Sequence, residues 1–103
     1  MLPGTLSSWM LDVMSELVKK KLETNQEFHD ALMETKNKVL AEATGDLFFA
    51  SGLSLELTMT TRPTNYPGLN HLGKILMELR SLCLLTEELV SEDLEGNHLQ
   101  NAN

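Results

Sequence analysis

The chain has 103 residues, of which 42% are hydrophobic and 22% are charged, and its formal net charge is −7. This length and composition predict one soluble globular unit with a thin core. The acidic balance argues against general nucleic-acid binding, which needs Lys and Arg to neutralise phosphates. The longest apolar runs reach only four or five residues. A membrane-spanning helix needs roughly 20, so no membrane partner is expected.

The cysteine and histidine content sets the expected chemistry and compartment. Cys83 is the only cysteine, so it cannot form a disulfide within the chain, and His29, His71 and His98 lack the spacing of a zinc motif. We therefore expect no metal and no cofactor. The N-terminal segment has neither a basic region nor a continuous apolar stretch, unlike a signal peptide. These features favour a reducing, cytoplasmic or nuclear location.

Two amphipathic helices are predicted in the first third of the chain. Ser7 or Ser8 can cap a first helix, because apolar residues recur at three- and four-residue spacing from Trp9 to Leu22. Asn25 then interrupts this pattern and is the natural N-cap of a second, shorter helix over about residues 26–35.

The centre of the chain loses the helical period. Residues 39–43 fit either a further helical turn or a short extended segment, and residues 53–61 alternate enough to fit a short strand. Gly45 and Asp46 form a turn signal between them. Residues 60–68 contain two prolines and a glycine and are predicted to form a loop, whose length is typical of functional loops.

The clearest predicted element is the last helix. Apolar residues from Leu72 to Val90 keep a three-four spacing, which makes this helix the expected central scaffold. The pattern stops at Ser91, and we expect the acidic and polar residues 91–103 to form a disordered tail. The predicted fold class is therefore mainly α with an irregular central segment, organised as one domain over residues 1–90 and a tail.

Five motifs between residues 31 and 80 carry a resemblance to a known family. They are Ala-Leu-Met-Glu-Thr at 31–35, Leu-Ala-Glu-Ala-Thr at 40–44, Asp46 followed by an aromatic pair and Gly52, Asn-His-Leu-Gly at 70–73, and Leu-Met-Glu-Leu-Arg at 76–80. In order and spacing they resemble the C-terminal half of the NADAR domain, over roughly residues 9–83. That family consists of N-glycosidases of ADP-ribose derivatives and of ribosylamine intermediates of riboflavin synthesis. The resemblance implies a mostly helical fold and hydrolysis of a bond between ribose C1 and a nitrogen.

The resemblance implies catalytic roles for Asp46 and Trp9. Breaking the glycosidic bond builds positive charge on the sugar, and a nearby carboxylate stabilises that charge. A Gly-Asp pair taken alone is more commonly a turn in which the aspartate binds its own backbone. Trp9 matches the family's functional tryptophan, which would stack on the base or line the pocket. A tryptophan on an apolar helix face is equally well explained as a core residue.

The resemblance also implies substrate-binding roles for Phe49, Gly52, Asn70 and Gly73. Phe49 stands where many family members have tryptophan, so an aromatic wall is kept. The helix start at residues 70–73 offers free backbone N–H groups to a phosphate or ribose hydroxyl. Capping by Asn70 and close packing of Gly73 explain these two residues nearly as well.

Glu42 and Arg80 match further family positions, but neither is assigned a catalytic role. An internal ion pair between them, tying the centre of the chain to the last helix, explains both residues at least as well as a contact with a ligand does.

One expected part of the family's site is absent from the sequence. Family members carry a further N-terminal half with a second catalytic carboxylate, and the eight residues before Trp9 cannot supply it. We therefore expect a truncated N-glycosidase domain for a small-molecule ribosyl substrate, weak or inactive alone. The alternative is a non-catalytic helical interaction module whose exposed apolar surface docks on a partner chain supplying the missing half. The first hypothesis predicts that Asp46, Phe48 or Phe49, and residues 70–73 converge on one cleft.

Overall fold

The computed structural model describes the backbone of residues 2–102 and the side chains of residues 7–90. Its helices are α1 (Leu2–Thr24), α2 (Gln26–Glu34), α3 (Leu55–Thr60), the 3-10 turn η1 (Pro63–Asn65) and α4 (His71–Ala102). No strand occurs within residues 2–102, so the predicted mainly α class is confirmed. None of the described helices combines the length and apolar character that crossing a membrane needs.

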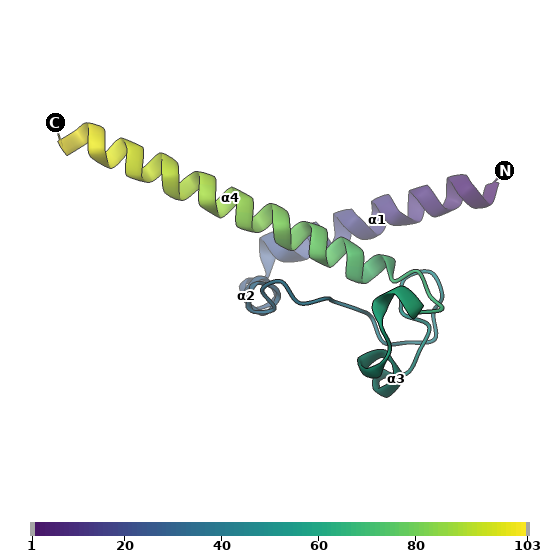
Figure 1. Ribbon diagram of the computed structural model, residues 1–103. Helices are drawn as coiled ribbons and strands as arrows, with labels where there is room; N and C mark the ends of the chain where they lie inside the picture. The colour runs from purple at the N-terminus through teal and green to yellow at the C-terminus, as the bar shows by residue number, and fades with distance from the viewer. Residues whose placement is uncertain (1, 103) are drawn as a thin grey trace.

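The main helices cross at one point near the middle of the molecule. α4 forms the long axis, α1 passes behind it, and α2 lies against both (Figure 1). Val18 and Leu22 of α1, Leu32 of α2 and Ile75 of α4 are the buried apolar residues of these helices. The His29 Nε2 and Glu87 Oε1 atoms, 3.2 Å apart, link α2 to α4. The connection between α2 and α4, including α3, gathers at the N-terminal end of α4 (Figure 1).

The break between α1 and α2 lies at Asn25, as the sequence predicts, but α1 starts several residues before its predicted start. The Asn25 side chain accepts a hydrogen bond from the Phe28 N–H at 3.0 Å, which confirms it as the N-cap of α2. The predicted cap at Ser7 or Ser8 is wrong, because α1 already begins at Leu2. Pro3 is compatible with that start, since the N–H that proline lacks has no intrahelical partner in the first turn.

The possible strand over residues 53–61 is wrong, because its centre forms the helix α3. Ser54 is the N-cap, and its hydroxyl accepts from the Leu57 N–H at 3.3 Å. The Thr58 hydroxyl donates to the Ser54 carbonyl at 2.7 Å. The polar residues of the apparent alternation therefore bind within their own helical turn. Residues 39–43 form no helical turn, and the predicted loop over residues 60–68 contains η1.

The last helix begins at His71 and continues past Val90, where its apolar pattern ends. The backbone of residues 91–102 is thus helical where the sequence predicts a disordered tail. Nothing in this segment forbids a helix, since it contains no proline and Gly96 is its only glycine. Its side chains lie outside the described residues, and the division into a domain and a tail at residue 90 stays a prediction.

The molecule is extended for its length. Its radius of gyration is 17.6 Å, whereas a compact domain of this length has about 13 Å. Both the N-terminal part of α1 and the C-terminal part of α4 project from the crossing (Figure 1). Leucines on the projecting part of α4 are therefore solvent-exposed, among them Leu82, Leu85 and Leu89. The fold leaves long helix faces without a neighbour in the described part of the chain.

Candidate functional site

Two segments of the chain meet at the N-terminal end of α4, and we call them the loop cluster: residues 40–52 and 66–73. Five backbone hydrogen bonds join them, from Gly68 to Ser51 (2.7 Å), Leu69 to Leu47 (2.9 Å), Asn70 to Ala50 (2.9 Å), His71 to Phe48 (3.2 Å) and Leu72 to Phe49 (3.0 Å), each written from the N–H to the carbonyl. The predicted site residues other than Trp9 all belong to these two segments: Asp46, Phe49, Gly52, Asn70 and Gly73. Of these five, only Asn70 lines the cavity described below, so their convergence on one cleft stays a prediction.

Asn70 holds this cluster together. Its side-chain Oδ1 accepts from the Glu42 N–H at 3.1 Å, and its Nδ2 donates to the Leu40 carbonyl at 2.9 Å. The residue is 5% exposed and has a φ of 51°, a left-handed conformation that asparagine tolerates better than most residues. Its amide group thus acts like the edge of a neighbouring strand for residues 40–42.

Three of the four N–H groups of residues 70–73 are not free, contrary to the sequence prediction, and only the Gly73 N–H has no partner among the described residues. The N–H groups of Asn70, His71 and Leu72 donate to carbonyls of residues 48–50. An anion docked on these groups would have to displace those bonds, so that part of the prediction is wrong. The assignment of Asn70 and Gly73 to substrate binding stays a prediction, with the local geometry favouring structural roles.

Three of the four glycines in the loop cluster, Gly52, Gly68 and Gly73, are required by close packing. A Cβ on Gly73 would lie 2.2 Å from the Leu40 carbonyl oxygen, and a Cβ on Gly68 would lie 2.2 Å from the Ala50 carbonyl oxygen. Gly52 has a φ of 81° and lies against Gly68 and Leu47. Side chains at these positions would separate the two segments.

Asp46 forms a turn near the middle of the segment 40–52. Its Oδ1 accepts from the Phe48 N–H at 2.8 Å and from the Phe49 N–H at 2.7 Å. The residue is exposed, and its Oδ2 has no hydrogen-bond partner among residues 7–90. The turn interpretation of the Gly-Asp pair is therefore confirmed, and it leaves one carboxylate oxygen open to a substrate.

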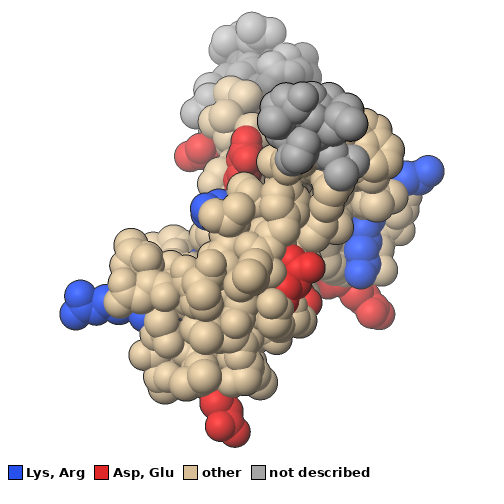
Figure 2. All heavy atoms as spheres, turned by 90° about the vertical axis from the view of Figure 1, so that its right-hand side faces the viewer, with Lys and Arg blue, Asp and Glu red and all other residues tan. Residues whose placement is uncertain are grey.

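Aromatic side chains lie beside Asp46. The Phe48 and Phe49 rings meet edge to face with centroids 4.7 Å apart, and Phe48 also contacts the His71 ring at 4.6 Å. These contacts connect the Asp46 turn to the first residue of α4. Figure 2 shows this end of the molecule with few charged side chains, most of them at its margins.

A cavity of about 290 Å³ adjoins the loop cluster on the side of η1. Tyr66, Asn70 and Lys74 contribute its polar groups, and Val39 and Met77 contribute apolar walls. Tyr66 offers a ring for stacking, and Lys74 offers a positive charge for a phosphate. The sequence prediction missed both residues, because nothing local marks a loop tyrosine and a surface lysine as neighbours.

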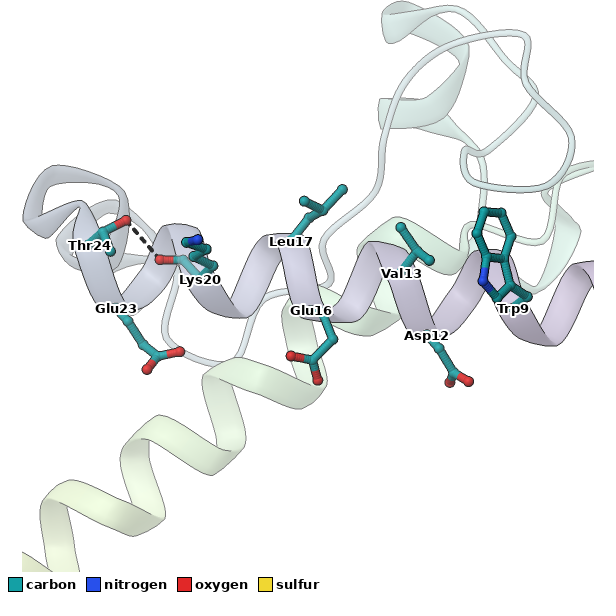
Figure 3. A pocket seen from close by; sticks show the side chains of 8 residues that line it. All are labelled: Trp9, Asp12, Val13, Glu16, Leu17, Lys20, Glu23 and Thr24. Atoms are coloured by element: carbon teal, nitrogen blue, oxygen red, sulfur yellow. Dashed lines mark hydrogen bonds between the residues drawn. The ribbon is translucent and has the colours of Figure 1, made fainter.

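Trp9 lines no pocket together with a described residue of the loop cluster. It is 61% exposed, so its interpretation as a core residue is wrong. It lines a groove of about 650 Å³ whose described wall residues all belong to α1, with none from the loop cluster (Figure 3). Asp46 does not line this groove. A catalytic role for Trp9 therefore stays a prediction.

Glu42 and Arg80 do not form the expected ion pair among residues 7–90. Arg80 is 6% exposed, and its Nη1 donates to the Thr35 hydroxyl at 2.7 Å, at the C-terminal end of α2, where a cation is stabilised. Glu42 is exposed, and its carbonyl accepts from the Ser51 N–H at 2.8 Å. Glu42 is therefore a second carboxylate carried by the loop cluster, which the expected ion pair had left out of the site.

His71 should titrate below its ordinary range. Burial lowers the pKa of His71, and the positive charge of Lys74 lowers it further. The unfolded chain then binds more protons than the folded chain as pH falls below about 6.5, so folding stability should decrease there and level off below the folded pKa. NMR titration of the imidazole and urea unfolding at pH 7.5 and 5 would measure both effects. His71→Phe should remove this contribution, and an unchanged pH dependence in that variant would contradict it.

The described residues contain no group of three His, Cys, Asp or Glu side chains placed to hold a metal ion. Burial raises the pKa of the Cys83 thiol, and the charge of Glu87 raises it further. Cys83 therefore stays a protonated thiol at neutral pH.

The chain belongs to the NADAR domain family, because the model of that domain matches residues 6–83. It is 33% identical over 70 residues to an N-glycosidase of Acanthamoeba polyphaga mimivirus, a match that covers 67% of this chain and 41% of the relative. It is also 38% identical over 80 residues to the chloroplastic riboflavin biosynthesis protein PYRR of Zea mays, covering 77% of this chain and 11% of the relative. The chain thus spans less than half the length of either relative. No solved structure matches it.

Proposed function

We propose that this domain contributes to hydrolysis of the N-glycosidic bond of an ADP-ribose or ribosylamine derivative. Family membership and the mimiviral relative named as an N-glycosidase support the reaction type. In this reaction the bond between C1 and nitrogen breaks, water supplies an oxygen to C1, and the leaving nitrogen takes up a proton. The sugar carries positive charge in the transition state, so the enzyme needs a carboxylate near C1.

One observation carries the proposal: Asp46 presents an unpaired carboxylate oxygen within the loop cluster. Two N–H groups fix its other oxygen, so the carboxylate is held in one orientation before substrate arrives. Phe49 follows in the same turn and offers a face for the base. Glu42 supplies a second carboxylate in the same segment, four residues before Asp46, available to direct the attacking water.

The cavity beside η1 suits the remainder of such a substrate. Lys74 is exposed and lines it, so it can pair with a phosphate, while Tyr66 can stack on a base or pack against a ribose. The cavity and the Asp46 turn are open to solvent, which weakens charge stabilisation and admits bulk water. We therefore expect this chain alone to be weakly active or inactive.

The decisive experiment places the chain's residues in the context of a longer relative. In a chimera, residues 6–83 replace the matching region of the mimiviral N-glycosidase, and release of nicotinamide or another base from ADP-ribose-type and ribosylamine substrates is measured. Activity of the chimera above that of the isolated chain supports the proposal. A chimera that folds and binds substrate but releases no base would contradict it.

A second candidate function is a non-catalytic helical interaction module. The radius of gyration of 17.6 Å and the exposed leucines of α4 favour it, because a self-contained small domain rarely leaves such faces open. Under this hypothesis neither the isolated chain nor the chimera hydrolyses any ribosyl substrate.

A further inference from the structure

The cavity beside η1 carries one positive charge and no negative one among its described lining residues. That charge belongs to Lys74, which is exposed and forms no ion pair with any residue in the range 7–90. Glu78, one helical turn further along α4, and Arg62, the N-cap of η1, do not line the cavity. In a chain whose formal net charge is −7, the wall of this cavity therefore offers an unneutralised cation to an anionic ligand.

Uncharged donors lie in the same wall. Thr64 of η1 is exposed, and its hydroxyl makes no hydrogen bond within residues 7–90. Tyr66 is half-buried, and its hydroxyl donates to the Thr58 carbonyl at a distance of 3.5 Å, which is long for a hydrogen bond. An ammonium group together with a free hydroxyl suits a phosphate, whose oxygens accept from several donors at once.

The volume and position of the cavity limit the size of the ligand. Its volume of about 290 Å³ lies at the lower end of ligand pockets, which span roughly 300–1,000 Å³. Leu69 is part of its wall, and the Leu69 N–H donates to the carbonyl of Leu47, the residue after Asp46, at 2.9 Å. The cavity wall is therefore hydrogen-bonded directly to the segment that carries the Asp46 carboxylate. This arrangement suits a ribose with its own phosphate better than a dinucleotide.

We infer that the cavity beside η1 is a phosphate subsite that selects ribosyl compounds ending in a single phosphate over ADP-ribose-type dinucleotides, with Lys74 as the specificity-determining residue. The inference rests on the proposed function, because it places the ribose C1 at Asp46. Lys74 pairs with the phosphate, Thr64 donates to it, and Tyr66 packs against the ribose. A terminal phosphate carries a charge of about −1.5 to −2 at pH 7, more than a phosphate within a diphosphate bridge, and it brings no second nucleoside into a small cavity.

Binding to the isolated chain tests the subsite without any reaction. The probes are ribose 5-phosphate, ribose and ADP-ribose, and the amide signals of Gly68, Leu69 and Lys74 in NMR spectra report on the cavity. Ribose 5-phosphate should bind at least about tenfold more tightly than ribose, the factor expected from a charge-assisted hydrogen bond. It should also bind more tightly than ADP-ribose, and added salt should weaken its binding.

Matched lysine variants separate the subsite from general attraction of anions. Lys74→Gln should weaken binding of ribose 5-phosphate by about tenfold and leave binding of ribose unchanged. Lys20→Gln removes the same charge from an exposed lysine of α1 that does not line this cavity, so it should leave both affinities unchanged. Circular dichroism of each variant checks that the helices are retained.

Kinetics of the chimera described above distinguish this inference from the proposed reaction. Lys74→Gln should raise KM for a ribosylamine 5-phosphate by about tenfold and leave kcat nearly unchanged, because the phosphate contact is the same in the ground state and the transition state. A chimera that releases base with a KM unaffected by Lys74→Gln would overturn the inference and leave the reaction standing. Selective binding of ribose 5-phosphate by a chain whose chimera releases no base would support the subsite and contradict the reaction.

Three binding results would also overturn the inference. They are equal affinities for ribose 5-phosphate and ribose, tighter binding of ADP-ribose than of ribose 5-phosphate, and equal losses of affinity in Lys74→Gln and Lys20→Gln.

Discussion

Asp46→Asn should reduce base release by the chimera by about 10²–10³-fold, the range expected for loss of one preorganised group that stabilises charge in the transition state. The amide keeps an oxygen that can accept from the Phe48 and Phe49 N–H groups, so the turn should persist. The negative charge near the ribose is lost. Initial rates with substrate below and above KM would show whether the loss lies in kcat, as expected for a group acting in the transition state.

The control for this experiment is the unfolding free energy of the Asp46→Ala variant. Alanine removes the acceptor of both N–H groups, and the isolated chain should lose about 1–2 kcal/mol of unfolding free energy, whereas Asp46→Asn should lose much less. If Asp46→Asn reduces activity only as far as it reduces stability, Asp46 is a turn residue and not a catalytic one.

Gly73→Ala and Gly68→Ala should each destabilise the isolated chain by about 1–3 kcal/mol or more. In both cases the added Cβ would lie 2.2 Å from a backbone carbonyl oxygen, of Leu40 and of Ala50 respectively, and backbone cannot move aside as a flexible side chain can. Separating these segments also breaks the bonds of Asn70. Thermal unfolding followed by circular dichroism would register a fall of about 4–8 °C per kcal/mol.

Gly45→Ala is the matched control, since a Cβ at Gly45 would meet nothing within 4 Å. It should change stability by less than about 0.5 kcal/mol. Equal melting temperatures for Gly73→Ala and Gly45→Ala would show that the contact between α4 and residue 40 is not part of the folded state.

The features that the sequence predicts correctly are those decided by nearby residues. The Asn25 cap depends on a bond to Phe28 and the turn at Asp46 on bonds to Phe48 and Phe49, all within three positions. The sequence pattern of α3 predicts a possible strand for a related reason. Its threonines look β-forming, but the Ser54 hydroxyl caps a helix by accepting from the Leu57 N–H, and the Thr58 hydroxyl donates to the Ser54 carbonyl within the same turn.

The features that could not be predicted depend on distant residues. The bonds of the Asn70 side chain reach 28 and 30 positions back along the chain, and no local pattern distinguishes them from an ordinary helix cap. The expected pair of Glu42 with Arg80 failed in the same way. Arg80 instead reaches Thr35 at the end of α2, a contact that depends on how the helices cross. The family resemblance identifies residues of the loop cluster, but it does not reveal the hydrogen bonds that join its two segments.

The bond network of Asn70 has a consequence for how the molecule opens. Residues 40–42 belong to no helix, yet their backbone is bound through Asn70 to the first turn of α4. Local unfolding of that turn must therefore release the 40–42 segment at the same time, and the two behave as one cooperative unit. Protection of the Glu42 amide against solvent exchange is thus governed by the fraying of α4. The candidate site therefore opens with the same free energy as the N-terminal end of that helix.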